Sequence, residues 1–209
     1  MCVRPFRIQN FLYKETDVTS HHLISFLEDL ARTYMLDRYL SSDPLEIDTM
    51  IIKNGGKPKG NVNTVCWENI NIGKSSKVGE KIENFVFNYF DYVIWKDNKE
   101  ADFEFAYRTS VEHFYPQHPI GRPPMDFRPL HSFGNLCIIS RGMNSKFSNY
   151  LPTGKAGNFG DADSMKTYSL KLQYMINSVK NKETWDEATI LRKEQEAKEL
   201  LKYALTPQD

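Results

Sequence analysis

Helical periodicity runs through most of this chain and leaves only the stretch from 103 to 139 for β-strands. Apolar residues recur every three or four positions, which is the pattern of an amphipathic helix. The segments with this pattern are 20–39, 78–95, 164–180 and 184–204. Because helices take up so much of the sequence, we expect an α+β fold that is mainly helical.

The strand-like sequence encloses a long connection that is rich in proline. Apolar and aromatic residues alternate over 103–107, as in a half-buried strand, and 111–114 is expected to form another short strand. The segment 136–139 is apolar and partly β-branched, so we interpret it as the return strand. The connection between them contains Pro116, Pro119, Pro123, Pro124 and Pro129. The pattern predicts a strand–loop–strand unit set among amphipathic helices.

Length and composition are those of an ordinary globular protein. The 209 residues fit one or two domains, on a prior of roughly 150 residues per domain. Hydrophobic residues make up 40% and charged residues 26% of the chain, which is usual for a protein with a buried core. Loop-like sequence at 54–60 and 73–76 marks a boundary zone. We therefore predict a helical N-terminal connector region, 1–76, and a second domain, 77–209.

Cysteine usage and charge argue against several classes of protein. Cys2, Cys66 and Cys137 are far apart and form no C-x-x-C pair, so we expect neither a disulfide framework nor a zinc knuckle, and we predict a cytoplasmic location. We expect no signal peptide, no membrane span and no membrane partner. The formal net charge is zero, so overall charge does not indicate a nucleic-acid partner, although basic residues could gather on one face.

A carboxylate, an imidazole and two amides follow one another around the predicted strands. Glu112 and His113 are adjacent, and Asn135 and Asn144 come after the proline-rich connection. Carboxylate and amide oxygens suit a hard cation, and an imidazole can take a proton from water near neutral pH. In this hypothesis Glu112 and Asn144 bind a metal ion. Asn135 would hold the ring of His113 by a side-chain hydrogen bond and so fix which nitrogen acts as the base.

Each of these residues also has a purely structural interpretation. A single Glu-His pair is a weak signal, Gly134-Asn135 could be a turn before a strand, and Asn144 could cap a helix. For His131 a structural hydrogen bond near the site is favoured over a catalytic role. Gly73-Lys74-Ser75 looks like the end of a P-loop, but Glu68 stands where that motif requires glycine, so we reject nucleotide binding there.

The ordered set of motifs resembles a known family of nucleases. Glu-His-x-x-Pro-Gln at 112–117, Gly-Asn-Leu at 134–136 and Asn-x-Lys at 144–146 resemble the HNH (His-Me finger) endonucleases. The pattern is most similar to the C-terminal nuclease domain of GmrSD-type modification-dependent restriction endonucleases. The likeness extends over about 78–204 and includes Lys155 and the helix that begins near Trp185. Phe114 departs from the isoleucine that is commoner at its position.

The resemblance implies a fold and a reaction for the domain 77–209. The fold would be a ββα-metal (His-Me finger) core surrounded by amphipathic helices. The reaction would be hydrolysis of DNA phosphodiester bonds with Mg²⁺ or Mn²⁺, within a bacterial restriction or defence system. His113 would be the general base, oriented by Asn135, and Glu112 and Asn144 would be the metal ligands. Basic residues close to the cluster are predicted to bind the substrate, namely Arg141, Lys146 and Lys155.

The expected partners are DNA and a component that recognises the target. That component would be a separate NTPase/recognition subunit or an N-terminal domain that the family usually carries and this chain lacks. The alternative is a non-catalytic DNA-binding or subunit-docking module that keeps the nuclease fold. A nuclease that acts on RNA is a third interpretation.

Overall fold

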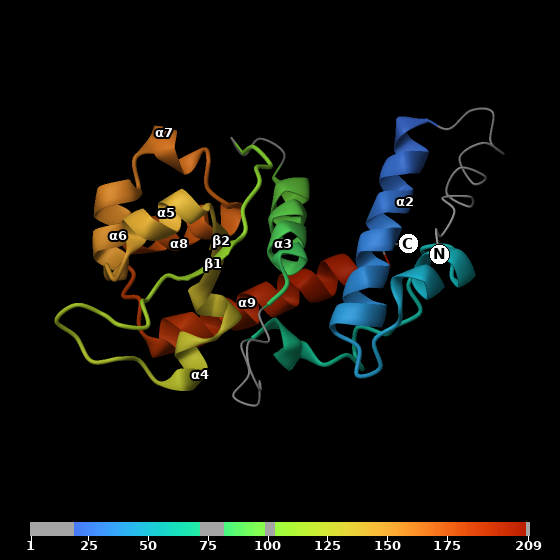
Figure 1. Ribbon diagram of the computed structural model, residues 1–209, viewed down its shortest axis with the longest axis horizontal. Helices are drawn as coiled ribbons and strands as arrows, with labels where there is room; N and C mark the ends of the chain where they lie inside the picture. The colour runs from blue at the N-terminus through green and yellow to red at the C-terminus, as the bar shows by residue number, and fades with distance from the viewer. Residues whose placement is uncertain (1–18, 72–81, 99–102, 208–209) are drawn as a thin grey trace, which may run out of the picture. The chain divides into compact units, whose positions relative to one another are not determined.

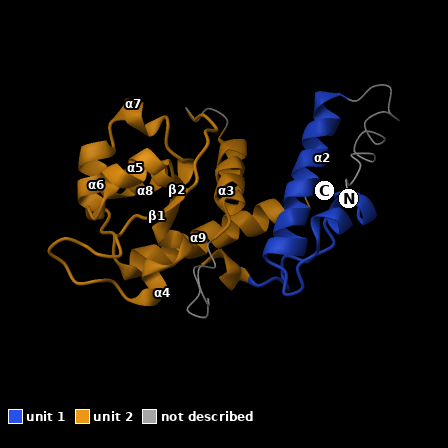
Figure 2. Cartoon of the chain, viewed as in Figure 1, with its two compact units in different colours: residues 1–66 blue, residues 67–209 orange. Residues whose placement is uncertain are grey.

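The computed structural model describes residues 19–71, 82–98 and 103–207 (Figure 1). The chain forms two compact units, 1–66 and 67–209, and each is described here by itself (Figure 2). The predicted boundary between 76 and 77 falls on residues outside the described ranges. Within those ranges, no helix combines the length and the apolar character that a bilayer crossing requires.

Unit 1 is helical and has a small core of its own. Helix α2 (Ser20–Thr33) begins where the Thr19 hydroxyl accepts a hydrogen bond from the His22 N–H, and it continues as π-helical turns over η1 (Tyr34–Tyr39). These two elements confirm the helix predicted over 20–39. A second π-helical segment, η2 (Thr49–Lys53), follows. The buried Asp37 carboxylate accepts hydrogen bonds from the N–H groups of Lys59 and Gly60, so the predicted loop is tied back to η1.

Unit 2 contains three long helices and one small sheet. The long helices are α3 (Asn84–Asp97), α8 (Leu170–Lys180) and α9 (Glu187–Leu205). Strand β1 (Ser110–His113) pairs antiparallel with β2 (Leu136–Ile139) in the register Glu112 opposite Cys137 and His113 opposite Leu136. Shorter elements complete the unit: η3 (Trp67–Ile70), α4 (Phe127–Leu130), η4 (Phe133–Asn135), α5 (Arg141–Phe147), α6 (Pro152–Phe159) and α7 (Ala162–Met165).

The sheet lies among the helices, as the sequence pattern predicts. Helices α3 and α8 pack on β2, and α5 packs on β1 (Figure 1). Every residue of β2 is buried, which fits the continuous apolar run in its sequence. A core of aromatic and aliphatic side chains fills the space between the sheet and the helices, including Phe114, Ile139, Phe147, Leu172, Ile176, Trp185 and Ile190. The mainly helical α+β prediction is therefore confirmed.

Two elements differ from the sequence-based predictions. The segment 103–107 is not a strand: Tyr107 is 92% exposed, and the rings of Phe103 and Phe105 pack on each other, with Phe105 also against Trp95. The alternating aromatic residues are thus used for edge-to-face ring packing and not for strand pairing. The helix predicted over 164–180 is interrupted, because the Ser169 hydroxyl accepts a hydrogen bond from Leu172 N–H and starts α8 at Leu170.

A glycine permits the close approach of η4 to α9. A Cβ atom on Gly134 would overlap the backbone carbonyl oxygen of Ile190 and lie 2.8 Å from the backbone nitrogen of Glu194. Both neighbours are main-chain atoms of α9, so they cannot move aside as a flexible side chain would. The turn that precedes β2 can therefore reach this position only with glycine.

We predict that Gly134→Ala lowers the free energy of unfolding of unit 2 by about 1–3 kcal/mol, the usual cost of overpacking a filled core. Gly142→Ala is the matched control, since an added Cβ there meets nothing within 4 Å. Urea unfolding followed by tryptophan fluorescence measures the effect, because Trp67, Trp95 and Trp185 all belong to unit 2. Equal midpoints for the two variants would contradict the predicted clash.

Candidate active site

Glu112 forms a buried ion pair with a lysine from α6. The Lys155 ammonium lies 2.6 Å from Glu112 Oε1 and also donates to the backbone carbonyls of His113, at 2.7 Å, and Phe114, at 3.0 Å. All three N–H donors of the ammonium are therefore used. Lys155 has no solvent exposure and Glu112 is 9% exposed. Burial raises the pKa of Glu112 and lowers that of Lys155, and the attraction within the pair opposes both changes.

This geometry gives Lys155 a different position from the one expected of a substrate-binding residue. Its ammonium is enclosed by the end of β1 and cannot meet DNA from solvent in this arrangement. The sequence did not predict α6, which begins with Pro152 at its first turn and carries Lys155 into the interior. We assign to Lys155 the task of fixing the Glu112 carboxylate and the end of β1.

His113 pairs with a second histidine. Its Nε2 lies 3.1 Å from Nδ1 of His131, and the two rings meet edge to face. Burial lowers the pKa of His113 to about 3, helped by the nearby charges of His131 and Lys155. Burial also lowers the pKa of His131. Both rings are thus neutral near pH 7, so one nitrogen donates and the other accepts. The structural hydrogen bond predicted for His131 is confirmed.

Asn135 is fully buried, and its amide is saturated by groups other than His113. The amide Nδ2 donates to the carbonyls of Tyr115, at 3.0 Å, and Leu130, at 2.9 Å. Its Oδ1 accepts from the Tyr115 N–H, at 2.8 Å, and from Trp185 Nε1, at 3.2 Å. These bonds use both donors and both acceptor positions of the amide. The expected hydrogen bond from Asn135 to the His113 ring is therefore corrected: the ring is held by His131.

The role of Asn135 follows from those partners. It bonds both backbone groups of Tyr115, two residues after His113, and the carbonyl of Leu130, next to His131. One side chain thus fixes the two segments that carry the paired histidines. Nothing in the sequence spacing indicated this, because the partners lie 5 to 50 positions away from Asn135.

The remaining predicted site residues lie on α5. Helix α5 begins where the Ser140 hydroxyl accepts a hydrogen bond from Met143 N–H, and it packs on β1 with Phe147 buried. Arg141, Asn144 and Lys146 are exposed. The structure therefore buries Glu112, Asn135 and Lys155 and partly buries His113 and His131, and it presents Asn144 with the two basic residues on the exposed part of the adjacent helix.

Over the described ranges, no group of three or more His, Cys, Asp or Glu side chains could hold a metal ion. The metal ligands expected from the sequence are only two, a carboxylate and an amide. A carboxylate from Glu112 and an amide from Asn144 would supply oxygen donors only, as Mg²⁺ prefers. Glu112 has a second oxygen and further lone pairs besides the one that meets Lys155, so the ion pair does not use up its capacity.

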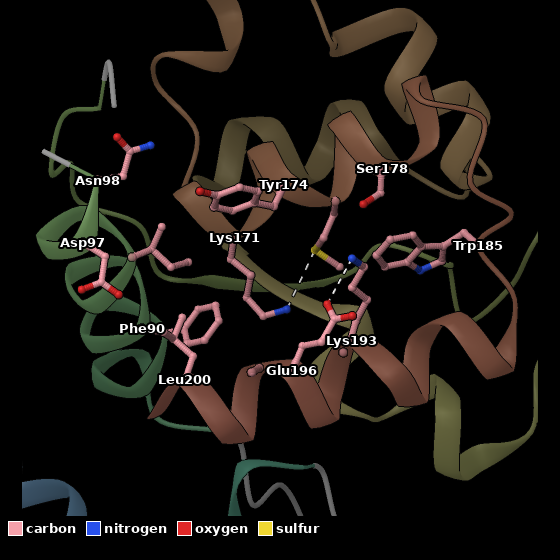
Figure 3. A pocket seen from close by; sticks show the side chains of 14 residues that line it. Phe90, Asp97, Asn98, Lys171, Tyr174, Ser178, Trp185, Lys193, Glu196 and Leu200 are labelled. Carbon is pink, nitrogen blue, oxygen red and sulfur yellow. Dashed lines mark hydrogen bonds and ion pairs between the residues drawn. The ribbon is translucent and has the colours of Figure 1, made fainter. Parts of the chain in front are cut away.

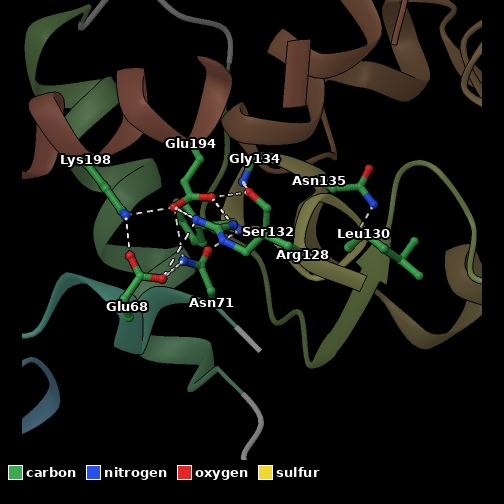
Figure 4. A network of polar contacts seen from close by, with 10 residues as sticks. Glu68, Asn71, Arg128, Leu130, Ser132, Gly134, Asn135, Glu194 and Lys198 are labelled. Atoms are coloured by element: carbon green, nitrogen blue, oxygen red, sulfur yellow. Dashed lines mark hydrogen bonds and ion pairs between the residues drawn. The ribbon is translucent and has the colours of Figure 1, made fainter. Parts of the chain in front are cut away.

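A second polar network supports the site from α9 (Figure 4). The Glu194 carboxylate is 3% exposed and accepts two hydrogen bonds from Arg128, at 2.7 and 2.8 Å, and others from Ser132, Asn71 and Lys198. Burial alone would raise the pKa of Glu194, but these donors outweigh it and bring the pKa down to about 2. The network joins η3, α4 and α9 just ahead of the turn that carries Asn135.

Together these features define a helical domain in which β1 of a small antiparallel sheet carries two paired residues: the buried Glu112, which pairs with Lys155 of α6, and His113, which pairs with His131 at the end of α4. The family model of the GmrSD restriction endonucleases, C-terminal domain, matches residues 66–202, which is more than half of the chain. The chain therefore belongs to the GmrSD restriction endonuclease C-terminal domain family. No curated protein and no solved structure matches it.

We predict that Lys155→Met lowers the free energy of unfolding by about 3–5 kcal/mol, because it leaves the Glu112 carboxylate buried without its cation. Lys146→Met, on the exposed part of α5, should change stability by no more than about 0.5 kcal/mol. Chemical denaturation of both variants at pH 7 makes the comparison. A Lys155→Met protein as stable as the Lys146→Met protein would show that the ion pair does not hold the end of β1.

The low pKa of Glu194 predicts an acid-sensitive contribution to stability. Its folded-state pKa, about 2, lies below the ordinary value of 4.5, so its stabilising effect is complete above about pH 4.5 and is lost as the pH falls towards 2. Glu194→Gln should therefore be less stable than wild type at pH 7, and the difference should shrink on acidification. Unfolding midpoints between pH 2.5 and 7 test this, with the exposed Glu199→Gln as control. A difference that does not vary with pH would contradict the assignment.

Proposed function

We propose that this domain is a metal-dependent, HNH-type DNA endonuclease that hydrolyses phosphodiester bonds in a bacterial restriction or defence system. The observation that carries the proposal is the hydrogen-bonded pair of His113 and His131 at the end of β1, the strand that also carries the buried Glu112, in a chain of a restriction endonuclease family. The order of the elements supports it as well. Two antiparallel strands, β1 and β2, are followed at once by α5, which packs back on β1, as a ββα-metal core requires.

We assign the tautomer in which Nε2–H of His113 donates to Nδ1 of His131, so that the lone pair of the His113 ring lies on Nδ1. Nδ1 then accepts a proton from the attacking water. The lowered pKa of His113 keeps the ring in this accepting state at neutral pH. His131 acts through His113 and is a positioning residue.

Glu112 and Asn144 are the residues that would hold Mg²⁺ or Mn²⁺. When bound, such an ion supplies Lewis-acid polarisation and stabilises the negative charge that develops on the phosphate oxygens. Lys155 keeps the Glu112 carboxylate in one orientation and neutralises it before the ion arrives. This arrangement explains how an ionised carboxylate is kept at a buried position.

The exposed basic residues of α5 are placed to bind the DNA backbone. Arg141 and Lys146 lie on the helix that follows β2, together with Asn144, and their charges would meet phosphates near the scissile bond. Target choice would rest with a separate NTPase/recognition subunit or an N-terminal recognition domain. We propose a cytoplasmic location, where such a system meets incoming DNA.

Removal of the base should abolish cleavage. His113→Ala is expected to lower the rate of supercoiled-plasmid nicking with Mg²⁺ or Mn²⁺ by about 10²-fold or more, the usual contribution of a general base. His118→Ala, an exposed histidine in the proline-rich connection, is the matched control and should nick at the wild-type rate. Equal rates for His113→Ala and wild type would refute the catalytic role.

A thermal-shift titration with Mn²⁺ separates the nuclease from a non-catalytic module. A metal-binding nuclease should gain stability with Mn²⁺, and the gain should disappear in Glu112→Gln and Asn144→Ala. A chain that shows neither this gain nor nicking would be a DNA-binding or subunit-docking module that keeps the nuclease fold. Parallel assays on plasmid DNA and on single-stranded RNA determine which nucleic acid is cut.

A further inference from the structure

A cavity of about 310 Å³ lies between α3, α8 and α9 of unit 2, apart from the proposed catalytic residues (Figure 3). This volume falls within the range of about 300–1,000 Å³ that is usual for small-molecule sites. The wall is mainly apolar and includes Phe90, Ile94, Met175, Trp185, Ala197 and Leu200. Phe90 of α3 and Trp185, the residue before the N-cap of α9, line the cavity with flat aromatic rings. Such a lining favours a flat apolar ligand.

One charged side chain reaches into this apolar space. Lys171, from the first turn of α8, is 6% exposed, and its ammonium contacts the Met175 sulfur at 4.0 Å (Figure 3). The ammonium also lies 4.6 Å from the centre of the Phe133 ring. The ring of Phe90 is 5.9 Å away. A thioether and ring faces compensate only partly for the lost hydration of an ammonium. Burial lowers the pKa of Lys171 to about 8, so the amine is still mostly protonated at pH 7.

The other charges of the cavity are neutralised or exposed. Lys193 lies 3.2 Å from Glu196 and 3.9 Å from Glu183, so its charge is already paired. Asp97 is exposed near the end of α3. Among the described residues, Lys171 is therefore the cavity cation whose ammonium has no anionic partner within hydrogen-bonding distance.

We propose that this cavity binds a small monoanion with a flat apolar body, of the aromatic carboxylate class. The carboxylate meets the Lys171 ammonium, and the body lies between Phe90, Trp185 and Leu200. Such a ligand supplies the hydrogen-bond acceptors that the buried ammonium lacks, and it covers the apolar wall. The inference does not depend on the proposed nuclease activity.

Occupancy of the cavity would reach the turn that supports the candidate active site. The ring of Phe133, which faces Lys171, and Gly134, which lines the cavity, both belong to η4. The next residue, Asn135, fixes the segments of the paired histidines. A bound carboxylate that draws the ammonium away from the Phe133 ring therefore acts on a turn shared by the two sites.

Titration of the full chain with 2-naphthoate, followed by isothermal calorimetry, tests the proposal. The wild type should bind 2-naphthoate, and Lys171→Met should bind it at least about tenfold more weakly, as expected for the loss of one charge-assisted hydrogen bond. Lys202→Met, on α9 and outside the cavity lining, should bind as the wild type does. The neutral analogue 2-naphthalenemethanol should bind the wild type at least about tenfold more weakly than 2-naphthoate does.

The absence of 2-naphthoate binding to the wild type at millimolar concentration overturns the proposal. Equal affinity of 2-naphthoate for Lys171→Met and Lys202→Met overturns it as well, and so does equal affinity of the two naphthalene compounds for the wild type. Ala197→Phe fills the cavity from α9 and leaves Lys171 in place, so it should also abolish binding. Circular dichroism and the unfolding midpoint show that each variant is folded, and an Ala197→Phe protein that is folded and binds normally contradicts the location.

Discussion

The approach of η4 to α9 is the constraint on which the rest of unit 2 depends. Gly134 lets the turn touch the backbone of α9, and Glu194 of the same helix gathers the side chains that surround the turn. The side-chain amide of Asn135 adds a further link to this region, because it hydrogen-bonds to Trp185, just before α9. The same amide bonds to Tyr115 and Leu130, which lie on either side of the proline-rich connection. The histidine pair is thus positioned by hydrogen bonds that originate several residues away from either ring.

The two buried lysines of unit 2 show how differently one side chain can be accommodated. Lys155 donates to the Glu112 carboxylate and to two backbone carbonyls, so all three of its N–H donors are satisfied. Removing Lys155 would destabilise the folded chain, because the Glu112 carboxylate would be buried without a cation. Lys171 is surrounded by sulfur and aromatic rings, which attract a cation but accept hydrogen bonds poorly. The contacts of Lys155 stabilise the folded chain, whereas the Lys171 ammonium keeps N–H donors that another molecule can use.

Much of the helical framework and both strands could be predicted from the sequence, because their apolar spacing is strong enough to specify them. The helix over 20–39 and the strand at 136–139 are examples. The segment 103–107 has the alternation of a strand, yet the rings of Phe103 and Phe105 pack edge to face, and alternation alone cannot distinguish these two uses. For the candidate site, the sequence suggested candidate residues but not which pairs they form. Asn135 and Lys155 bond to groups distant in sequence, and a single sequence carries no signal for such partners.

The contacts of Lys155 also protect the sheet from unwanted association. Since the Phe114 N–H bonds to the carbonyl of Asn135, the residue just before β2, the backbone groups of His113 point away from β2 and towards the outer edge of the sheet. An unpaired edge carbonyl invites a strand from another molecule. The Lys155 ammonium donates a hydrogen bond to the His113 carbonyl, so a strand from another molecule cannot pair there. The side chain that fixes the Glu112 carboxylate therefore also blocks one route to aggregation at the end of β1.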